Sequence, residues 1–298
     1  MAAAEVTRPT EFRSGSSHRA RSRGFSFDRW ALVALPPFVF LCIFFAYPLY
    51  KILEQSVTEN GGGLSNYRAF FGSAIYVQAL VRTFVVAGIS TAVCIVLGYP
   101  YAYLMTRVSP RWRNVLIFCV LVPFWTSLLV RTYAWTVILQ DTGVINRALQ
   151  GLGIVDQPVH LIRTTTGVVI GMSQILLPFM VLPLFANMRT IDSRYMRAAG
   201  NLGATPFQAF RSVYLPLSLP GLAAGSLIVF IYALGFYITP AFLGSPSDAV
   251  LSQLIVMQVS QLLDFGFGAA MGGVLLALTL ILIAFLARAT RVDAAYKS

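Results

Sequence analysis

The residue types that most often carry chemistry, cysteine and histidine, are few in this chain of 298 residues and lie far apart. The three cysteines, Cys42, Cys94 and Cys119, each lie alone in a different apolar stretch. The two histidines are His18, near the amino terminus, and His160, in a polar loop. Disulfide bonds, metal sites and Cys/His catalysis all need partners nearby, so this pattern predicts none of them.

Motifs for hydrolysis and phosphate binding are also missing from the sequence. It contains no G-x-S-x-G, H-E-x-x-H or G-x-x-x-x-G-K-[ST] pattern. Both lysines, Lys51 and Lys297, follow tyrosine rather than the glycine of a phosphate-binding loop. We therefore expect a chain that is not an enzyme, with no catalytic residue and no cofactor of its own.

A polar segment with a different potential lies between two long apolar stretches, at residues 195–216, and reads YMRAAGNLGATPFQAFRSVYLP. Asp192 is placed to cap a short helix over residues 193–201, because a carboxylate at this position accepts hydrogen bonds from free backbone N–H groups. Gly203 is expected to end that helix. One predicted face consists of Tyr195, Ala198, Ala199 and Leu202.

A second short helix is predicted to begin at Thr205. Pro206 occupies the favoured first position, and Gln208 completes a T-x-x-Q capping box. Its predicted apolar face consists of Phe207, Phe210 and Tyr214. We expect Leu215 and Pro216 to end this helix. The resulting helix-turn-helix could receive another protein, or it could lie on a membrane surface as an amphipathic loop.

The elements that hold this segment must be membrane helices. The chain is 57% hydrophobic and 11% charged, with a mean hydropathy of +0.73. A bilayer span needs about 20 mostly apolar residues. Six stretches qualify, at residues 32–50, 83–106, 115–139, 167–187, 221–243 and 269–287. We therefore predict an all-α membrane protein with six transmembrane helices in one domain, residues 30–298, behind a disordered basic tail, residues 1–29.

The distribution of lysine and arginine predicts the orientation, because short basic loops stay in the cytoplasm. Beyond the arginines of the tail, the basic side carries Arg107, Arg111, Arg113, Arg189, Arg194, Arg197, Arg211, Arg288, Arg291 and Lys297. Both termini are then cytoplasmic. A nucleic-acid partner is not expected from the net charge of +11, since the basic residues are spread over every loop on this side instead of forming one patch.

The polar segment also resembles a known element. Its R-A-A at residues 197–199, Gly203, and V-x-L-P ending at Pro216 are similar to the cytoplasmic "EAA" loop of permeases in binding-protein-dependent ABC importers. In that family the loop docks into a groove of the ATPase subunit. The resemblance implies a coupling loop over residues 190–220, whose docking residues are Arg197, Ala198, Ala199, Gly203, Ala204, Leu215 and Pro216. The chain departs from the family at Arg197, where the family carries glutamate.

Two further stretches resemble the spermidine/putrescine-type permeases: PFWTSLLVRTYAWTVILQDTGVIN at residues 123–146 and GFYITPAFLG at residues 235–244. This resemblance extends from the first predicted span to the last. It implies a type I ABC importer permease (MetI-like) architecture in the bacterial inner (cytoplasmic) membrane, in contact with membrane lipid. It also implies three kinds of partner: a second permease subunit, two ATPase subunits that bind ATP and Mg, and a periplasmic solute-binding protein. The expected solute is a polyamine or a related small organic molecule.

A path for a polyamine would need carboxylates or aromatic rings, since both receive cations. The candidate path residues of these two kinds, in and beside the two stretches, are Trp125, Tyr133, Trp135, Asp141 and Tyr237. Arg131 is a further candidate for the solute path. The aromatic residues could equally anchor the helices at the membrane surface. Arg131 would lie about 27 Å along a straight helix from Arg113 at about 1.5 Å per residue, near the outer edge of the bilayer. It could snorkel outward or pair with an outer carboxylate, or it could act as a gate or a contact for solute or partner.

Two other function classes remain open at this point. A secondary transporter would show internal repeats and ion-coupling polar residues near the bilayer centre, and neither is visible. A membrane scaffold would share the spans but would have no need of a docking loop. Close helix packing, within the chain or against a partner, is expected at the glycine pairs Gly167/Gly171, Gly221/Gly225 and Gly268/Gly272.

Overall fold

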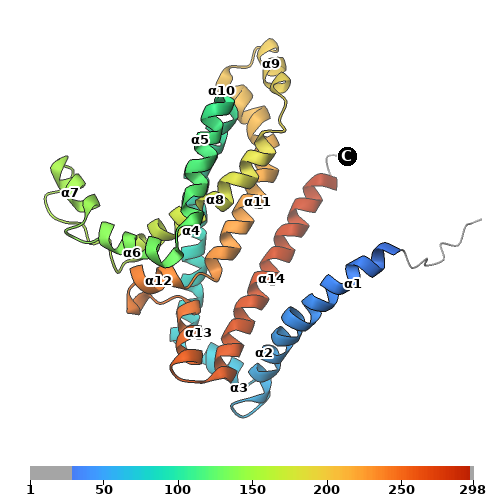
Figure 1. Ribbon diagram of the computed structural model, residues 1–298, viewed down its shortest axis with the longest axis vertical. Helices are drawn as coiled ribbons and strands as arrows, with labels where there is room; N and C mark the ends of the chain where they lie inside the picture. Colours follow the sequence, from blue (N-terminus) through green and yellow to red (C-terminus); the bar gives the residue numbers. More distant parts are fainter. Residues whose placement is uncertain (1–28, 296–298) are drawn as a thin grey trace, which may run out of the picture. The chain divides into compact units, whose positions relative to one another are not determined.

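The computed structural model describes residues 29–295, and within that range the chain is helical and contains no strand (Figure 1). The predicted basic tail, residues 1–29, lies outside the described part except for Arg29, the first residue of α1. The chain divides into two units after Tyr50. We describe each by itself and call residues 51–298 the main unit.

The first predicted span begins with α1 (Arg29–Leu41), passes through a π-helical turn (Cys42–Ala46) and continues in α2 (Tyr47–Thr58). Residues Leu35–Thr58 are long and apolar enough to cross a membrane. The prediction ended this span at residue 50, where charged residues begin. The helix continues to Thr58, and Lys51 and Glu54, one turn apart in this extension, form an ion pair of 2.8 Å that supports it.

The core of the main unit is α8 (Thr165–Met188), which packs against α4 (Ala74–Arg107) and α11 (Leu215–Leu234). Its inward side chains are fully buried, as Met172, Leu176, Met180 and Leu184 show. Both α4 and α8 confirm predicted spans, and so does α14 (Phe265–Ala295). An apolar helix that is buried on most of its surface gains its stability from this packing.

Glycines let these helices approach one another closely. A β carbon added to Gly225 would lie 3.0 Å from the backbone oxygen of Met180, and one added to Gly171 would lie 2.6 Å from the side chain of Leu243. Gly221 faces Asn187 of α8 in the same way. The predicted glycine pairs are therefore used inside the chain at these positions, whereas a β carbon at Gly272 would meet nothing within 4 Å.

The predicted third span, residues 115–139, is not one helix, and this corrects the sequence prediction. The chain forms α5 (Pro110–Leu121) and a 3₁₀ turn (Val122–Trp125), then turns by 99° into α6 (Leu128–Ile138). Pro123 lies in the 3₁₀ turn, a few residues before the bend, and it lacks the N–H that a continuous α-helix would use there. With this bent pair counted as one span, the described residues contain up to six candidate spans.

The predicted fifth span, residues 221–243, also differs. A continuous apolar helix runs over Pro206–Leu234, through α10 (Pro206–Ala209), a π-helical turn (Phe210–Tyr214) and α11. The expectation that Leu215 and Pro216 end a helix is wrong. The π-helical turn places the N–H of Leu215 on the carbonyl of Phe210, so the wider turn accommodates the proline. After Leu234 the chain breaks and forms the separate helix α12 (Ile238–Leu243).

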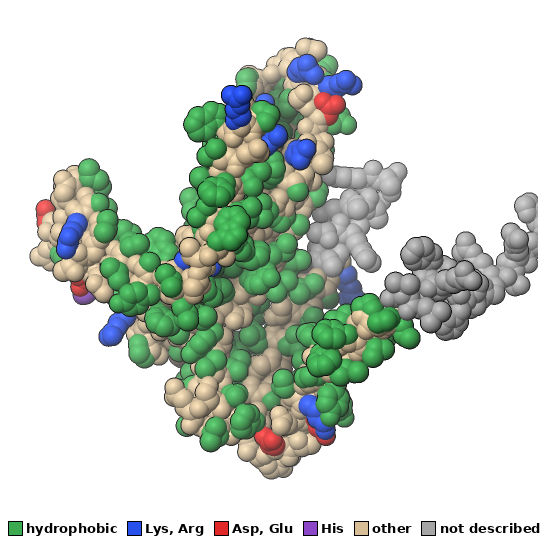
Figure 2. Space-filling model, viewed as in Figure 1, with side chains coloured by type: hydrophobic (Ala, Val, Ile, Leu, Met, Phe, Trp, Pro, Cys, Tyr) green, Lys and Arg blue, Asp and Glu red, His purple; other side chains and the backbone are tan. Residues whose placement is uncertain are grey.

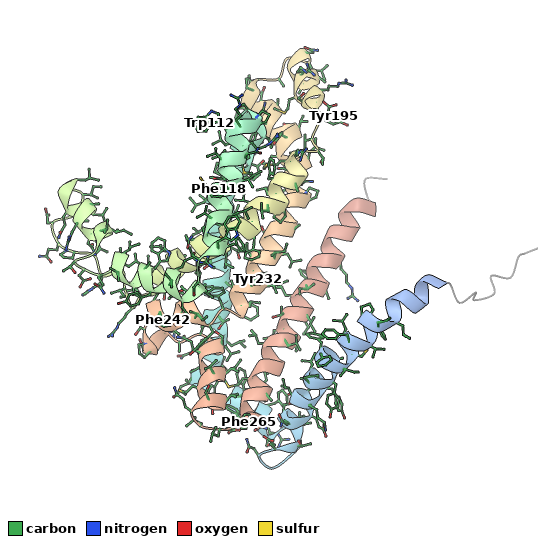
Figure 3. The ribbon with its side chains drawn as sticks, in the orientation of Figure 1. Trp112, Phe118, Tyr195, Tyr232, Phe242 and Phe265 are labelled. Carbon is green, nitrogen blue, oxygen red and sulfur yellow. The ribbon has the colours of Figure 1, made fainter. Side chains whose placement is uncertain are left out.

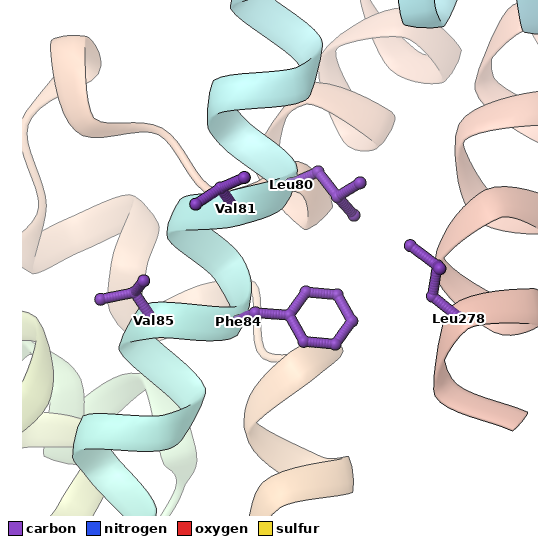
Figure 4. Close-up of a pocket in the computed structure, with 5 residues that line it drawn as sticks. All are labelled: Leu80, Val81, Phe84, Val85 and Leu278. Carbon is purple, nitrogen blue, oxygen red and sulfur yellow. The ribbon is translucent and has the colours of Figure 1, made fainter. Parts of the chain in front are cut away.

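Shorter helices complete the main unit: α3 (Ser65–Gly72), α7 (Val144–Gly151), the 3₁₀ turn Pro246–Asp248 and α13 (Leu251–Ser260). Arg82 of α4 holds the segment before α13, since it donates to the carbonyl of Ser247 at 2.7 Å and pairs with Asp248 at 3.0 Å. An apolar pocket of about 460 Å³ lies between α4 and α14, and Figure 4 shows the residues that line it, Leu80, Val81, Phe84, Val85 and Leu278. Its lining offers no polar group for a polar solute.

Candidate functional site

The polar segment folds into two capped helices, as predicted. In α9 (Ser193–Asn201), the carboxylate of Asp192 accepts from the N–H of Arg194 at 2.8 Å. Gly203 follows with φ of +88°, a conformation that glycine adopts without strain. The N–H of Ala204 then donates to the carbonyl of Ala199 at 3.0 Å and closes the end of the helix.

The second cap is the predicted capping box. The N–H of Thr205 donates to the side chain of Gln208 at 2.9 Å, and the N–H of Gln208 donates to the hydroxyl of Thr205 at 3.3 Å. The cap at the start of α9 and the cap at the start of α10 each join residues no more than three positions apart. The turn between α9 and α10 is therefore held by local hydrogen bonds at each side.

The apolar residues of this turn point away from the rest of the chain. Leu202 is 89% exposed and Phe207 is 71% exposed, and Tyr195 lies at the free end of the unit in Figure 3. A β carbon on Gly203 would meet nothing within 4 Å. We call this set the tip surface: Tyr195, Ala198, Leu202, Gly203 and Phe207. Exposed large apolar side chains beside small ones are typical of a surface that another protein or a membrane covers.

The tip surface is surrounded by basic side chains. Figure 2 shows blue Lys and Arg side chains gathered over α9 and α10. Arg194 lies 3.7 Å from the carboxylate of Asp192, while Arg197 takes part in none of the ion pairs found among residues 29–295. The resulting surface combines apolar groups with positive charge.

Aromatic rings connect the tip to the core. Tyr214, after α10, packs edge to face on Tyr103 of α4 with ring centroids 5.1 Å apart, and Phe210 packs on the same ring at 5.5 Å. The guanidinium of Arg107 lies 5.0 Å from the centroid of Tyr103. Sequence reasoning missed this cluster, although the spacing of Tyr99, Tyr103 and Arg107 by four residues on one helix face could have indicated it. These rings therefore connect the residues after α10 to α4.

The residues predicted to line a solute path lie around the bend between α5 and α6. Arg131, Tyr133 and Trp135 are on α6, which packs against α12, where Thr132 and Thr239 place their hydroxyl oxygens 3.4 Å apart. Tyr237 immediately precedes α12. The structure thus brings the two predicted stretches together through the contact between α6 and α12.

These candidates differ in what they contact. Trp135 donates to Gln174 at 3.4 Å and packs on the core, whereas Tyr133 is exposed. Trp125 is exposed beside Phe118, with ring centroids 5.9 Å apart. Asp141 lies 2.9 Å from the ring nitrogen Nδ1 of His160, a partner that the sequence did not indicate for either residue.

The predicted position of Arg131 in the membrane requires a correction. Its predicted height of about 27 Å assumed a straight helix from Arg113, and the 99° bend removes that premise. Its Nε atom is buried without a hydrogen-bond partner, and Arg131 forms no ion pair with a described carboxylate. Pairing with an outer carboxylate of this chain is therefore not observed within residues 29–295. A buried and unsatisfied guanidinium atom is costly and is often retained for function.

A buried asparagine organises the loop after α6, and sequence reasoning missed it. Asn146 is fully buried, donates to the carbonyls of Gln140 and Val159 at 3.1 and 3.0 Å, and accepts from the N–H of Val159 at 2.8 Å. Gly143 is needed beside it, because an added β carbon would collide with the carbonyl oxygen of Ile138. An asparagine within a stretch of apolar residues was the available signal.

The described part of the chain contains no cluster of side chains that could form a metal site. No group of three or more His, Cys, Asp or Glu side chains that could hold a metal ion occurs there. The three cysteines are free.

Comparison with known proteins places these features in context. Residues 95–293 match the family described as binding-protein-dependent transport system inner membrane component. The spermidine/putrescine transport system permease protein PotB of Haemophilus influenzae is 34% identical over 262 residues, which cover 85% of this chain and 91% of that protein. PotB of Escherichia coli is 35% identical over 207 residues, covering 70% and 75%. The crystal structure of a bacterial alginate ABC transporter, with 20% identity, covers 86% of this chain and 92% of its own with a TM-score of 0.73, which shows the shared fold.

Proposed function

We propose, from the premise that this chain belongs to the family of inner membrane components of binding-protein-dependent transport systems, that its tip surface couples a polyamine path to a separate ATPase. The chain is a multi-pass membrane protein and a permease subunit of an ABC importer. This membership replaces the alternatives of a secondary transporter and of a scaffold.

The exposed tip surface carries the coupling proposal. Leu202 and Phe207 expose apolar side chains to water between two helices whose caps are all satisfied locally. A docked ATPase subunit would bury these side chains, and burial of one leucine contributes about 1.5–3 kcal/mol. The aromatic cluster of Tyr103, Phe210 and Tyr214 would transmit the movement to α4 and α11.

The assembly is part of the same role. One such chain would provide half of a path, so a second permease subunit, two ATPase subunits and a periplasmic solute-binding protein complete the importer. ATP and Mg bind to the ATPase subunits. The tip surface and both termini then lie on the cytoplasmic side of the inner membrane of a bacterium. The basic side chains gathered over α9 and α10 agree with this orientation, because basic loops stay in the cytoplasm.

The proposed solute is a polyamine such as spermidine or putrescine. Two relatives that match most of this chain are named as permeases for these solutes. The bend between α5 and α6, beside α12, supplies exposed aromatic rings at Trp125 and Tyr133 that could receive ammonium groups. Asp141 is the carboxylate nearest in sequence to these rings.

Two measurements test this function. The chain, its ATPase, its second permease and its binding protein are reconstituted in liposomes, and uptake of labelled spermidine is measured with and without ATP. Uptake that needs ATP is expected, and no uptake of any polyamine would exclude the proposed solute.

Orientation is tested separately. After the native cysteines are replaced, single cysteines at Thr205 and Ser247 are labelled in intact cells with an impermeant thiol reagent. We expect labelling at Ser247 alone. Labelling of the Thr205 position from outside would overturn the coupling role of the tip surface.

A further inference from the structure

Arg131 is a charged side chain inside a candidate span, and it has no partner in the described part of the chain. It lies on α6, and its Nε atom is buried without a hydrogen bond. Arg131 takes part in none of the ion pairs found among residues 29–295. Asp141, the carboxylate nearest to it in sequence, pairs with His160 instead. The guanidinium therefore lacks a counter-charge among the described residues.

Two contacts with α8 indicate the depth of Arg131 in the membrane. Phe124, which precedes it, packs on Phe179 with ring centroids 5.3 Å apart. Trp135, one turn after it, donates to Gln174 at 3.4 Å. Arg131 is thus level with residues 174–179 of α8, a stretch that begins nine residues after the start of this helix and stops nine residues before its end. At about 1.5 Å per residue, each end is about 14 Å away, so Arg131 lies near the middle of a span.

A positive charge at this depth has to be paired. A guanidinium stays protonated in proteins, so Arg131 cannot become neutral as a buried lysine can. Arginines inside spans are rare, face the interior of the protein or a watery cavity, and pair there. Snorkelling to lipid headgroups is open to residues near helix ends, whereas Arg131 is level with the middle of α8. The counter-charge therefore comes from the protein assembly rather than from a lipid headgroup.

The surface of α6 beside Arg131 is open. One stripe of this helix, at a spacing of three and four residues, consists of exposed side chains: Val130, Tyr133, Ala134 and Val137. We call these four residues the open stripe. Val130 and Tyr133 are each 64% exposed. The other face of α6 packs on the main unit, where Thr132 meets Thr239 of α12. Figure 1 shows α6 at the side of the main unit, next to α12.

Arg131 lies at the edge between the open stripe and the packed face, and it is partly buried. A second chain that covers the stripe would therefore reach the guanidinium. Tyrosine and arginine are enriched in the centres of protein interfaces, where other charged residues are depleted. Lipid tails could cover the valines, but they would leave the guanidinium unpaired. A polyamine, which is itself a cation, would be repelled by Arg131.

We propose that the open stripe is an interface with the second permease subunit, and that a carboxylate inside a span of that subunit pairs with Arg131. The existence of the second subunit rests on the proposed function. Opposite charges at an interface fix the partner and the register in which it binds. The pair would also neutralise Arg131 beside the bend between α5 and α6. A cationic solute could then pass this bend without repulsion.

The test exchanges charges between the two permease chains. They are produced together with the ATPase and isolated through a tag on this chain, and the ratio of second permease to tagged chain is measured. Arg131→Glu should lower this ratio at least about tenfold, which corresponds to about 1.4 kcal/mol, because two carboxylates then face each other. Arg131→Lys keeps the charge and should lower it less. Arg147→Glu, at an exposed position on α7, is the matched control and should leave the ratio unchanged.

The exchange is completed in the second permease. Each Asp or Glu in its spans is replaced by Arg in turn, and one of these changes should restore the ratio with Arg131→Glu while it lowers the ratio with the wild-type chain. If no replacement restores it, although Arg131→Glu inserts and unfolds like the wild type, the ion pair is excluded. If Arg131→Glu fails to insert, Arg131→Gln takes its place, and an unchanged ratio with Arg131→Gln would also exclude the pair.

A photoreactive amino acid at Tyr133 tests the interface independently of charge. Illumination of the assembled importer in lipid nanodiscs should join this chain to the second permease. A product with the binding protein alone, or with lipid alone, would overturn the interface. A restored ion pair in an importer that takes up no polyamine would support the interface and exclude only the proposed solute. Absence of any second permease from the wild-type preparation would overturn the proposed assembly, and this inference with it.

Discussion

Gly225 of α11 packs directly on the backbone of Met180 in α8, since an added β carbon would lie 3.0 Å from the carbonyl oxygen and 3.3 Å from the α carbon of Met180. We expect Gly225→Val to lower the free energy of unfolding by about 1–3 kcal/mol, the usual cost of overpacking. Gly272→Val is the control, because its β carbon would meet nothing within 4 Å. Thermal unfolding of the two variants in detergent measures the difference. Equal stability would show that α8 and α11 do not pack as described.

The loop after α6 provides a second prediction. Asn146→Ala removes three hydrogen bonds to Gln140 and Val159 and leaves partly buried backbone groups without partners. Each such group costs about 1–3 kcal/mol, so we expect faster proteolysis of residues 140–160 and a lower unfolding temperature. His160→Ala breaks an exposed pair with Asp141, which contributes about 0–1 kcal/mol, and should change little. Equal proteolysis of both variants would contradict the role given to Asn146.

The features that the sequence predicted well are local. Asp192 and the Thr205/Gln208 capping box act within three residues, so residue type and spacing decided them. The apolar spans 83–106, 167–187 and 269–287 were also predictable, because hydropathy over about 20 residues needs no knowledge of neighbours. Here local preference and the final fold agree.

The features that escaped prediction depend on contacts between distant residues. After the 99° bend, α6 packs against α12, and Thr132 and Thr239 at this contact are 107 residues apart in the sequence. Pro216 looked like a helix end, but a π-helical turn allows the helix to continue. Asn60, before α3, donates a hydrogen bond to Asp264, before α14, across 204 residues of sequence. Single-sequence spacing contains no information on such pairs.

The role of Arg131 in transport can be tested by substitution, because its buried Nε atom makes no hydrogen bond that the substitution would remove. Arg131→Leu should therefore insert and unfold like the wild type, while uptake falls about tenfold, as expected for loss of a charged contact of about 1.4 kcal/mol to solute or partner. Arg147→Leu, at an exposed position on α7, is the control. Initial rates of ATP-driven uptake in liposomes provide the measurement. Full uptake by Arg131→Leu would leave only a structural role for this residue.

Leu202 tests the tip surface with little risk to the fold, because it is 89% exposed. Leu202→Asp should weaken ATPase association about 10- to 150-fold, the loss expected when a leucine that contributes about 1.5–3 kcal/mol is no longer buried. Leu152→Asp, which is 74% exposed beside α7, is the matched control. Gly203 is a poorer site, since its φ of +88° would strain any other residue. Normal ATPase binding by Leu202→Asp would exclude this surface from the interface.

Arg197 is the position at which the chain departs from the glutamate of its family, and its charge can be reversed without loss of a known partner. Arg194 and Arg211 lie on the same segment, so a partner that fits this surface should present negative charge. We expect Arg197→Glu to reduce solute-stimulated ATP hydrolysis about 2- to 30-fold, because an exposed pair of about 0.2–1 kcal/mol is replaced by a repulsion of similar size. Hydrolysis by Arg197→Gln should lie between that of the wild type and that of Arg197→Glu, and the defect should shrink as salt rises, since exposed charges are screened.

Arg111→Glu makes the same charge change on α5, outside the tip surface, and should leave coupling unchanged. Hydrolysis by Arg197→Glu that equals or exceeds the wild type would instead indicate an ATPase surface suited to the family's acid, and the basic tip would then serve orientation in the membrane rather than recognition.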